Sequence, residues 1–567
     1  MKLFNLNITS KQVTTTLLIW VLVCSIIPNI WLSLTERMSI IQSVTNVILP
    51  LGVYMLLMSI SRKVGPATLW MIIIFIFAAF QMVLLYMYGR SIIAVDMFLN
   101  VVTTNPDEVG ELLGNLTVII AAVVLIFLPP IIMGTVSLMR SWHIRSSILK
   151  RTRRLSILTI TIGLICFGLS FTSARPYNPV CDLFPVNVIY NLCTAVNRTI
   201  KVARYDNTSS DFTYQATSQR PDTMPELYVL VIGETARAAN WQINGYNRPT
   251  TPRLMNLQGL TSFSKAISQS NTTHKSVPML LSPLEASNFG DSIYQVKSLI
   301  TAFKEAGFST AFFSCHRRNR SFIDFFGDEA DTTVFIKEEL ADSVTTLLYD
   351  TDLLPYLDRA IATGNRKQLI VLHSYGSHFN YIDRYPENEA VFQPDRPASA
   401  SYQYRREQIN AYDNTILFTS NMIADIVERL KATGKVGGLI YASDHGEDIF
   451  DDERRLFLHA SPIPSYYQIH VPMLVWLSNS YSQQFPDKQS ALSQNCDKYV
   501  SPSRSVFHSL MDMAGISTQW NQLEHSVLNS DYKSGSSIYL NDHNKAVELN
   551  NCGILDYDTK MFNKLGI

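Results

Sequence analysis

The sequence has few charged residues, few cysteines and no net charge. Charged side chains make up 17% of its 567 residues, against about 25% in an average soluble domain. Seven cysteines are too few for a disulfide scaffold in a chain of this length. The 47 basic and 47 acidic side chains cancel, which excludes a basic nucleic-acid-binding protein, and a hydrophobic content of 47% excludes a disordered one. A chain this long is expected to hold more than one domain.

Long hydrophobic runs are confined to the first 171 residues, where there are five. None contains a charged residue, and each approaches the ~20 residues that a helix needs to cross a bilayer. The runs are Val13–Leu32, Ile41–Ser61, Ala67–Tyr88, Leu116–Met139 and Leu155–Phe171. We therefore predict an N-terminal transmembrane domain of five helices over residues 1–172.

Basic residues beside these runs indicate the orientation of the chain. With five spans, the segment 140–154, which carries six basic residues and no acid, lies on the same side as Lys11, Arg62 and Lys63. An excess of Lys and Arg marks the cytoplasmic side of a membrane protein. The chain after the fifth span is therefore expected outside the cytoplasm.

The outer segment 89–115, between the third and fourth runs, is unusually long and mixes apolar and polar residues. Such a composition is typical of a helix that lies in the lipid headgroup layer. A more specific interpretation is that Asn100, Thr104 and Glu108, spaced four residues apart, form one polar face over a lipid headgroup.

The second half has a different pattern. Residues 173–225 are polar and irregular and are predicted to form a linker with one helix near Val186–Val202. From residue 226 onward, short apolar runs alternate with helical segments such as Val296–Ala306 and Arg405–Ala432. This pattern predicts an α/β domain over residues 226–567, with a mostly parallel sheet flanked by helices. The expected strands are Leu227–Ile232, Thr310–Phe313, Leu369–His373, Gly438–Ala442 and Val471–Leu477.

Polar residues follow three of these expected strands. Glu234 follows the first, His378 follows the third, and Asp444 with His445 follows the fourth. In open α/β sheets the ligand site lies beyond the carboxyl ends of the strands, and mixed carboxylate and imidazole ligands suit zinc. Taken singly, each has a simpler explanation as a helix cap, a turn pair or a hydrogen-bonding histidine. Together they predict a metal site.

The motifs at these positions resemble one known family. They read Gly-Glu-Thr-Ala-Arg at 233–237, Gly-Ser-His-Phe-Asn-Tyr at 376–381 and Ser-Asp-His-Gly-Glu at 443–447. They are similar to those of the phosphoethanolamine transferases that modify lipid A, which include the colistin-resistance enzymes and belong to the alkaline phosphatase/sulfatase superfamily. The resemblance covers nearly the whole chain, including five spans before an outer catalytic domain.

The resemblance implies a set of site residues. The nucleophile of the family is a threonine three residues before Ser-Val-Pro, which is Thr273 here, with Thr272 as its nearest rival. Glu234, Thr273, Asp444 and His445 then look like the ligands of a catalytic zinc ion.

Two further groups of residues gain roles from the resemblance. His378 and His459 resemble the histidine pair that handles the substrate phosphate and can hold a second zinc ion. Asn100, Thr104 and Glu108 fall where the family has polar residues facing the lipid donor.

The implied function is transfer of phosphoethanolamine from phosphatidylethanolamine to lipid A, or to another surface glycolipid, through a zinc-activated threonine and a covalent phosphoethanolamine–threonine intermediate. The implied location is the bacterial inner membrane, with the catalytic domain in the periplasm, as a monomer that binds no nucleic acid. A glycerol-phosphate transferase and a sulfatase-like hydrolase are alternatives, and a non-enzymatic membrane sensor is another. A sulfatase should carry Cys-x-Pro-x-Arg around its nucleophile, and the segment around Thr273 does not.

Several features stay open or depart from the family pattern. Gln269-Ser270 and Met279 replace the residues that carry the bracing disulfide beside the nucleophile, and the interval from Asp444 to His459 is longer than usual. Among the outer cysteines, we predict disulfides between Cys181 and Cys193 and between Cys496 and Cys552, with Cys315 unpaired, although the sequence does not fix the connectivity. The basic cluster His316–Arg320 is interpreted either as a site for acceptor phosphates or as a solvated loop. Neither the acceptor nor the number of zinc ions follows from the sequence.

Overall fold

The computed structural model describes residues 10–36, 38–88, 92–103, 116–173, 177–339, 347–535 and 537–567. The chain divides into two compact units. The first comprises residues 1–98 and 112–196, and the second comprises residues 99–111 and 197–567. Each unit is described by itself below.

The first unit is a bundle of apolar helices. Four of them are long and apolar enough to cross a membrane, and α3 with α4 makes a fifth span that is bent by 49°. The predicted spans are therefore confirmed as four to five helices, with one correction: the third span is broken at Met71. The helices are α1 (Ser10–Thr35), α2 (Ile40–Met58), α3 (Val64–Trp70), α4 (Ile72–Tyr88), α7 (Thr117–Met139), α8 (Ser146–Ser170), the short α9 (Pro179–Asp182) and most of α10 (Val186–Val202).

Two glycines explain how closely α2 and α8 approach. A Cβ atom on Gly163 would lie 2.8 Å from the Cα of Leu49, and one on Gly52 would lie 2.9 Å from the backbone nitrogen of Ile160. Membrane helices gain packing energy when small residues let their backbones come together. Any side chain at these positions would force the two helices apart.

The three residues predicted to face a lipid lie almost entirely outside the residues that the structure describes. Asn100 belongs to α5 (Val95–Thr103), but its side chain is not described, and Thr104 and Glu108 lie outside the described residues. Their proposed role stays a prediction.

The second unit is built on a seven-stranded sheet with the order β3-β10-β7-β2-β6-β4-β5. The five strands from β7 to β5 run parallel, whereas β10 runs antiparallel to both β7 and β3. The prediction of a mostly parallel sheet is confirmed. The strands are β2 (Glu226–Gly233), β3 (Leu260–Phe263), β4 (Ser309–Ser314), β5 (Thr332–Phe335), β6 (Lys367–His373), β7 (Val436–Ser443) and β10 (Met473–Leu477).

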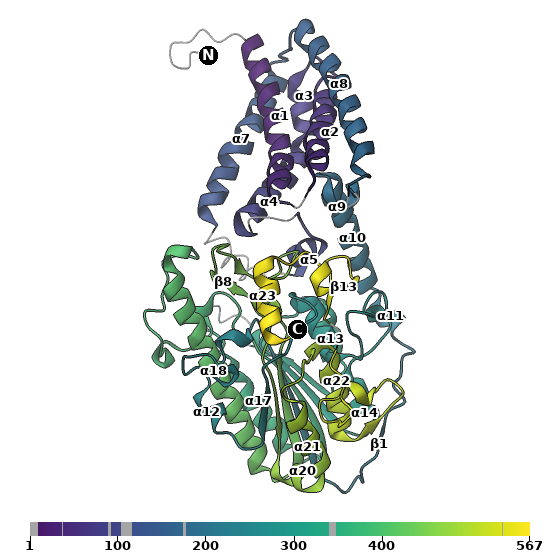
Figure 1. The fold of residues 1–567 in the computed structure, drawn as a ribbon, viewed down its shortest axis with the longest axis vertical. Coiled ribbons are helices and arrows are strands. Elements are labelled where there is room, and N and C mark those ends of the chain that lie inside the picture. The colour runs from purple at the N-terminus through teal and green to yellow at the C-terminus, as the bar shows by residue number, and fades with distance from the viewer. Residues whose placement is uncertain are drawn as a thin grey trace. The chain divides into compact units, whose positions relative to one another are not determined.

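Helices cover both faces of this sheet (Figure 1). On one face lie α12 (Pro252–Met255), α17 (Leu354–Ala362) and α18 (Arg405–Ala432), and on the other lie α13 (Thr273–Leu281), α14 (Leu299–Glu305) and α22 (Pro502–Ala514). The remaining helices and strands are α11 (Tyr205–Thr208), α15 (Phe322–Gly327), α16 (Ile336–Glu339), α19 (Tyr466–Ile469), α20 (Asn479–Gln484), α21 (Pro486–Asn495), α23 (Asp556–Leu565), β1 (Thr217–Ser218), β8 (Asp448–Ile449), β9 (Phe457–Leu458), β11 (Ile516–Ser517), β12 (Ile538–Leu540) and β13 (Ala546–Glu548).

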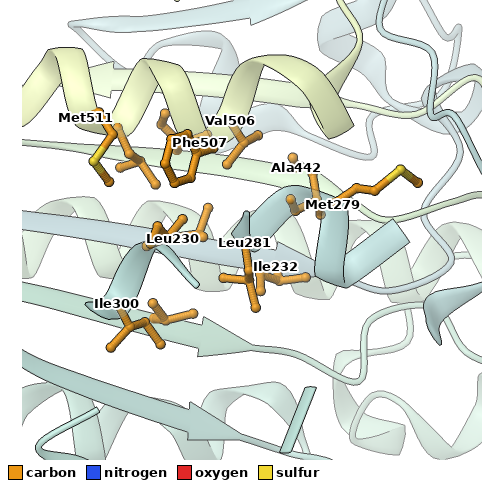
Figure 2. Packing of buried hydrophobic residues seen from close by; sticks show 14 of the residues in the cluster. Leu230, Ile232, Met279, Leu281, Ile300, Ala442, Val506, Phe507 and Met511 are labelled. Atoms are coloured by element: carbon orange, nitrogen blue, oxygen red, sulfur yellow. The ribbon is translucent and has the colours of Figure 1, made fainter. Parts of the chain in front are cut away.

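The core beneath α13 fixes the position of that helix. Met279 and Leu281 of α13 belong to the same buried cluster as Leu230 and Ile232 of β2, and Phe507 of α22 packs beside them (Figure 2). Burial of a large apolar side chain contributes about 1.5–3 kcal/mol, so α13 is anchored firmly by its C-terminal half. Its first residue is thereby held at the edge of the sheet.

Neither of the two predicted disulfides is formed. The thiol of Cys496 donates to the carbonyl oxygen of Ser493, and that of Cys552 donates to the carbonyl oxygen of Leu549. Cys181 and Cys193 are likewise not joined. Apolar burial therefore holds the core of the second unit together without a Cys496–Cys552 bridge.

Candidate metal centre and nucleophile

Three elements deliver polar side chains to the carboxyl-terminal edge of the sheet. Glu234 directly follows β2, Asp444 and His445 directly follow β7, and Thr273 is the first residue of α13. The strands β2 and β7 are neighbours and end at the same level, because Gly233 pairs with Ser443. Parallel register therefore places these side chains together.

The hydroxyl of Thr273 lies at the centre of this group. Its Oγ1 donates to Glu234 Oε1 over 3.1 Å and lies 3.1 Å from His445 Nε2. The rival Thr272 is different, because its hydroxyl lies 3.1 Å from that of Ser270 and its side chain is buried. The geometry therefore favours Thr273 over Thr272 as the nucleophile.

The atoms of this group are arranged as donors for a cation. One atom from each of Glu234, Asp444 and His445 lies within 4.8 Å of the others. Glu234 Oε2 and Asp444 Oδ2 are buried and find no hydrogen-bond partner among the described residues. His445 Nδ1 donates to the carbonyl oxygen of Gly446 over 3.0 Å, which leaves the lone pair of Nε2 facing the group. Two carboxylates, an imidazole and a hydroxyl fit zinc.

The pKa values of the two carboxyl groups are shifted in opposite directions. Burial raises the pKa of Asp444 well above its usual range, and the negative charge of Glu234 adds to the rise. Burial also raises the pKa of Glu234, but the hydrogen bond and charge of His445 outweigh it and hold that pKa well below its usual range. Two carboxylates at one buried point repel each other, and a bound cation relieves that repulsion.

Hydrogen bonds take the place of a disulfide beside Thr273. The hydroxyl of Ser268 donates to the carbonyl oxygen of Asp444 over 2.6 Å, and Asn271 donates to Gln468 Oε1 over the same distance. The side-chain oxygen of Gln269 accepts from the backbone nitrogen of Ala286 over 2.8 Å. The loop that carries Thr273 is therefore braced by buried polar contacts.

His378 and His459 lie next to the four-residue group. The ring of His459 is 4.3 Å from that of His445 and 5.8 Å from that of His378, measured between centroids. Nδ1 of His459 lies 3.2 Å from Glu447 Oε2. A carboxylate at Nδ1 keeps the proton there and leaves the lone pair on Nε2.

Glu447 is a site residue to which sequence reasoning assigned no role. It stands two residues after His445 in the Ser-Asp-His-Gly-Glu motif, and that short spacing was the available signal. Burial raises the pKa of its carboxyl, and the hydrogen bond from His459 opposes the rise. We interpret Glu447 as a positioning residue that acts through His459.

Glu447→Ala is expected to lower kcat by about 10- to 100-fold, the range typical of groups that orient a catalytic or ligating histidine. KM should change little, and Glu447→Gln should recover part of the loss because its amide oxygen still accepts from Nδ1. Steady-state kinetics on the full-length enzyme give both values. Full activity in Glu447→Ala together with inactive His459→Ala would show that His459 needs no orienting partner.

A cavity of about 650 Å³ lies within the second unit. His274 and Lys275, the two residues that follow Thr273 in the chain, line part of it. Cationic side chains of Arg198, Lys275 and Arg320 line it together with aromatic rings, among them Tyr294 and Phe322. A cavity with both features suits a ligand that is anionic at one end and apolar at the other.

The basic cluster after β4 serves several purposes. Arg318 forms an ion pair with Asp328 over 2.5 Å, and His316 stacks on the ring of His373 with centroids 4.3 Å apart. Arg320 lines the cavity. Only part of the cluster is therefore placed to meet a ligand there.

Residues 226–516 match the sulfatase family model. The chain belongs to the sulfatase family. A Kdo(2)-lipid A phosphoethanolamine 7''-transferase of Salmonella typhimurium is 30% identical over 305 residues, which are 53% of this chain and 52% of that relative. The match thus spans about half the length of this relative. The resemblance of the motifs to lipid A phosphoethanolamine transferases is confirmed.

Solved structures share the fold. The integral membrane lipooligosaccharide phosphoethanolamine transferase A of Neisseria meningitidis matches with a TM-score of 0.72 and 20% identity, over 90% of this chain and 98% of that one. The C-terminal periplasmic domain of EptC from Escherichia coli, in complex with Zn, matches with a TM-score of 0.55 and 24% identity, over 62% of this chain and 99% of that one. The chain therefore combines a membrane unit and a sulfatase-like domain, as the sequence predicted.

Proposed function

We propose that this protein transfers phosphoethanolamine from phosphatidylethanolamine to lipid A or a related surface glycolipid. The observation that carries the proposal is the hydroxyl of Thr273, held 3.1 Å from both Glu234 Oε1 and His445 Nε2 inside a group of metal-binding side chains. Relatives that are named phosphoethanolamine transferases support the choice of transferred group.

Zinc would be held by Glu234, Asp444, His445 and Thr273. When bound there, it lowers the pKa of the threonine hydroxyl and neutralises charge on the phosphoryl oxygens. The buried Oδ2 of Asp444, which has no hydrogen-bond partner among the described residues, supports this placement.

The reaction has two displacements at phosphorus. In the first, Thr273 Oγ1 bonds to phosphorus and the bond to the diacylglycerol oxygen breaks. The proton of the threonine hydroxyl ends on that oxygen, so diacylglycerol leaves as an alcohol. In the second, an oxygen of the acceptor bonds to phosphorus and the bond to Thr273 breaks, while the proton of the acceptor passes through His459 to Thr273 Oγ1, which is a hydroxyl again.

Other groups of the chain assist these displacements. Thr273 is the first residue of α13, where the helix dipole stabilises negative charge on the transferred phosphoryl group. His459, with its proton held at Nδ1 by Glu447, offers the lone pair of Nε2 to the acceptor hydroxyl as a general base. His378 is placed to bind a phosphoryl oxygen beside it.

The cavity beside the nucleophile supports lipid substrates. Its cations match a phosphate, and its aromatic walls match acyl chains or the apolar part of a glycolipid. The apolar helices of the first unit support a location in a membrane, and we propose the bacterial inner membrane with the second unit in the periplasm. We also propose that the protein works as a monomer and that Asn100, Thr104 and Glu108 contact the donor.

Mass spectrometry of lipid A from cells that express the chain tests the proposal. We expect a gain of phosphoethanolamine that is absent with Thr273→Ala. Purified enzyme given phosphatidylethanolamine or phosphatidylglycerol with labelled headgroups separates the proposed activity from a glycerol-phosphate transferase. Release of free headgroup without transfer would instead indicate a hydrolase.

Arg320→Ala is expected to raise KM for phosphatidylethanolamine by about 5-fold with little change in kcat, because one Lys or Arg near a lipid phosphate contributes about 1 kcal/mol. Arg359→Ala is the matched control, since Arg359 lies on α17 over the opposite face of the sheet. Kinetics in mixed micelles check both variants. An equal effect of the two changes, or none from Arg320→Ala, would argue against lipid binding in the cavity.

A further inference from the structure

A second group of metal-ligating side chains shares Glu234 with the first. One atom from each of Glu234, His316 and His373 lies within 4.8 Å of the others. His373 is the last residue of β6, and His316 follows β4 by two residues. Both strands end at the level of β2, because Ile232 and Ser314 pair with His373. Register alone therefore brings the three side chains together, and no step proposed above uses the two histidines.

The two oxygens of Glu234 are used unequally. Oε1 accepts from the hydroxyls of Thr273 and Thr235 over 3.1 Å and 2.9 Å, and it lies 3.3 Å from His445 Nε2. Oε2 is buried and has no hydrogen-bond partner among the described residues. A carboxylate in this state can bind a ligand through each oxygen and so bridge two sites.

The hydrogen bonds of the two histidines leave one ring nitrogen of each available. Nε2 of His316 lies 2.9 Å from the carbonyl oxygen of Ser374, which can only accept, so the proton is on Nε2 and the lone pair is on Nδ1. Nδ1 of His373 lies within hydrogen-bond distance of Ser314 Oγ, at 3.1 Å, and the same oxygen accepts from the backbone nitrogen of His316.

Because Nδ1 is engaged with Ser314, Nε2 is the nitrogen of His373 that faces away from a hydrogen-bond partner. It is fully buried and has no hydrogen-bond partner in the described part of the chain. Histidines that bind metals usually have their other nitrogen tied by such a hydrogen bond. Both rings meet that condition.

The rings are also held in place by stacking. The ring of His316 lies between His373, at 4.3 Å and 17°, and Tyr375, at 4.5 Å and 7°. Nearly parallel rings direct their lone pairs side by side, so the ion would lie at the edge of the stack.

We propose that Glu234, His316 and His373 bind a second divalent cation, of the zinc type, with Glu234 bridging the two sites. Two imidazole nitrogens and one carboxylate oxygen suit zinc better than magnesium or calcium, which prefer oxygen ligands. Three protein ligands leave one coordination position for water or a substrate oxygen. The site is distinct from the His378 and His459 pair, since neither belongs to this group of three.

Zinc content of the full-length protein in detergent tests the proposal. The protein is stripped with a chelator, reloaded with Zn²⁺, desalted and measured by plasma mass spectrometry. We expect His316→Phe and His373→Phe each to bind one equivalent less than the wild type. Phenylalanine keeps a flat ring in the stack, so the change removes the ligand nitrogen and preserves the packing.

Two further variants locate the missing ion. Asp444→Asn should lose the ion of the first site and keep the ion held by His316 and His373. His459→Ala should also keep that ion, because His459 is not one of its ligands. Circular dichroism confirms that each variant is folded, and His316→Gln gives a second removal of the ligand if the phenylalanine variant unfolds. Replacement by Co²⁺ adds an independent readout, since loss of a nitrogen ligand alters the visible absorption of the second ion.

Wild-type zinc content in His316→Phe, His316→Gln and His373→Phe would overturn the proposal and leave the stack as packing that supports the loop of Glu234. Loss of the second equivalent only in His459→Ala would also overturn it, because the ion would then belong to the His378 and His459 pair. The readout is metal content, so the result does not depend on which lipid the enzyme modifies.

Discussion

Thr273→Ala is expected to lower transfer by at least about 10⁴-fold, the size of loss seen when a covalent nucleophile is removed. The hydroxyl of this side chain makes the hydrogen-bond contacts with Glu234 and His445, and alanine removes both. Thr273 is half-buried, so its truncation should cost on the order of 1 kcal/mol of folding free energy or less. Thr273→Ser keeps the hydroxyl and should retain weak activity.

Thr272→Ala is the matched control for this experiment. Thr272 precedes the helix and contacts Ser270 instead of the metal-binding group, so its removal should leave most of the activity. Wild-type enzyme incubated with phosphatidylethanolamine and no acceptor should gain one phosphoethanolamine group on Thr273, found by peptide mapping. An adduct on Thr272 would move the nucleophile by one residue, and no adduct on either would indicate direct transfer in a single step.

The strands that carry the site were predictable because they are buried on both faces. Continuous apolar runs such as Leu227–Ile232 and Leu369–His373 coincide with β2 and β6, and their ends mark where polar residues begin. The direction of β10 was not predictable. An apolar run reads the same in a parallel and an antiparallel strand, and only the pairing of Met473 with Ala442 fixes its direction.

The break in the third span left no mark in the sequence either. The run Ala67–Tyr88 contains no proline or charge that would signal a bend, and the helix is nevertheless interrupted at Met71.

The roles of Glu447 and His316 were not predictable from the sequence for a different reason. Their partners, His459 and His373, are distant in the chain, and only strand register and loop geometry bring them into contact.

Asp444→Asn is expected to remove the first metal ion and to lower activity by at least about 10³-fold, since a catalytic metal contributes several kcal/mol to the transition state. This substitution tests metal binding specifically, because the two oxygens of Asp444 have different partners. Oδ1 accepts from the backbone nitrogens of Thr235 and His445 over 3.1 Å and 2.6 Å, and an asparagine oxygen can do the same. Oδ2, which has no hydrogen-bond partner among the described residues, becomes an amide that cannot bind zinc.

Stability should separate metal loss from misfolding. In the metal-free protein the variant should be as stable as the wild type or more so, because a buried carboxyl beside Glu234 is replaced by a neutral group. Zinc should raise the Tm of the wild type and not that of Asp444→Asn, since a ligand that binds only the folded state stabilises it. Asp448→Asn is the control: Asp448 is equally buried but contacts Ser465 and Gln468, so this variant should keep its zinc. Undiminished zinc and activity in Asp444→Asn would exclude Asp444 as a ligand and require a different set of residues around Thr273.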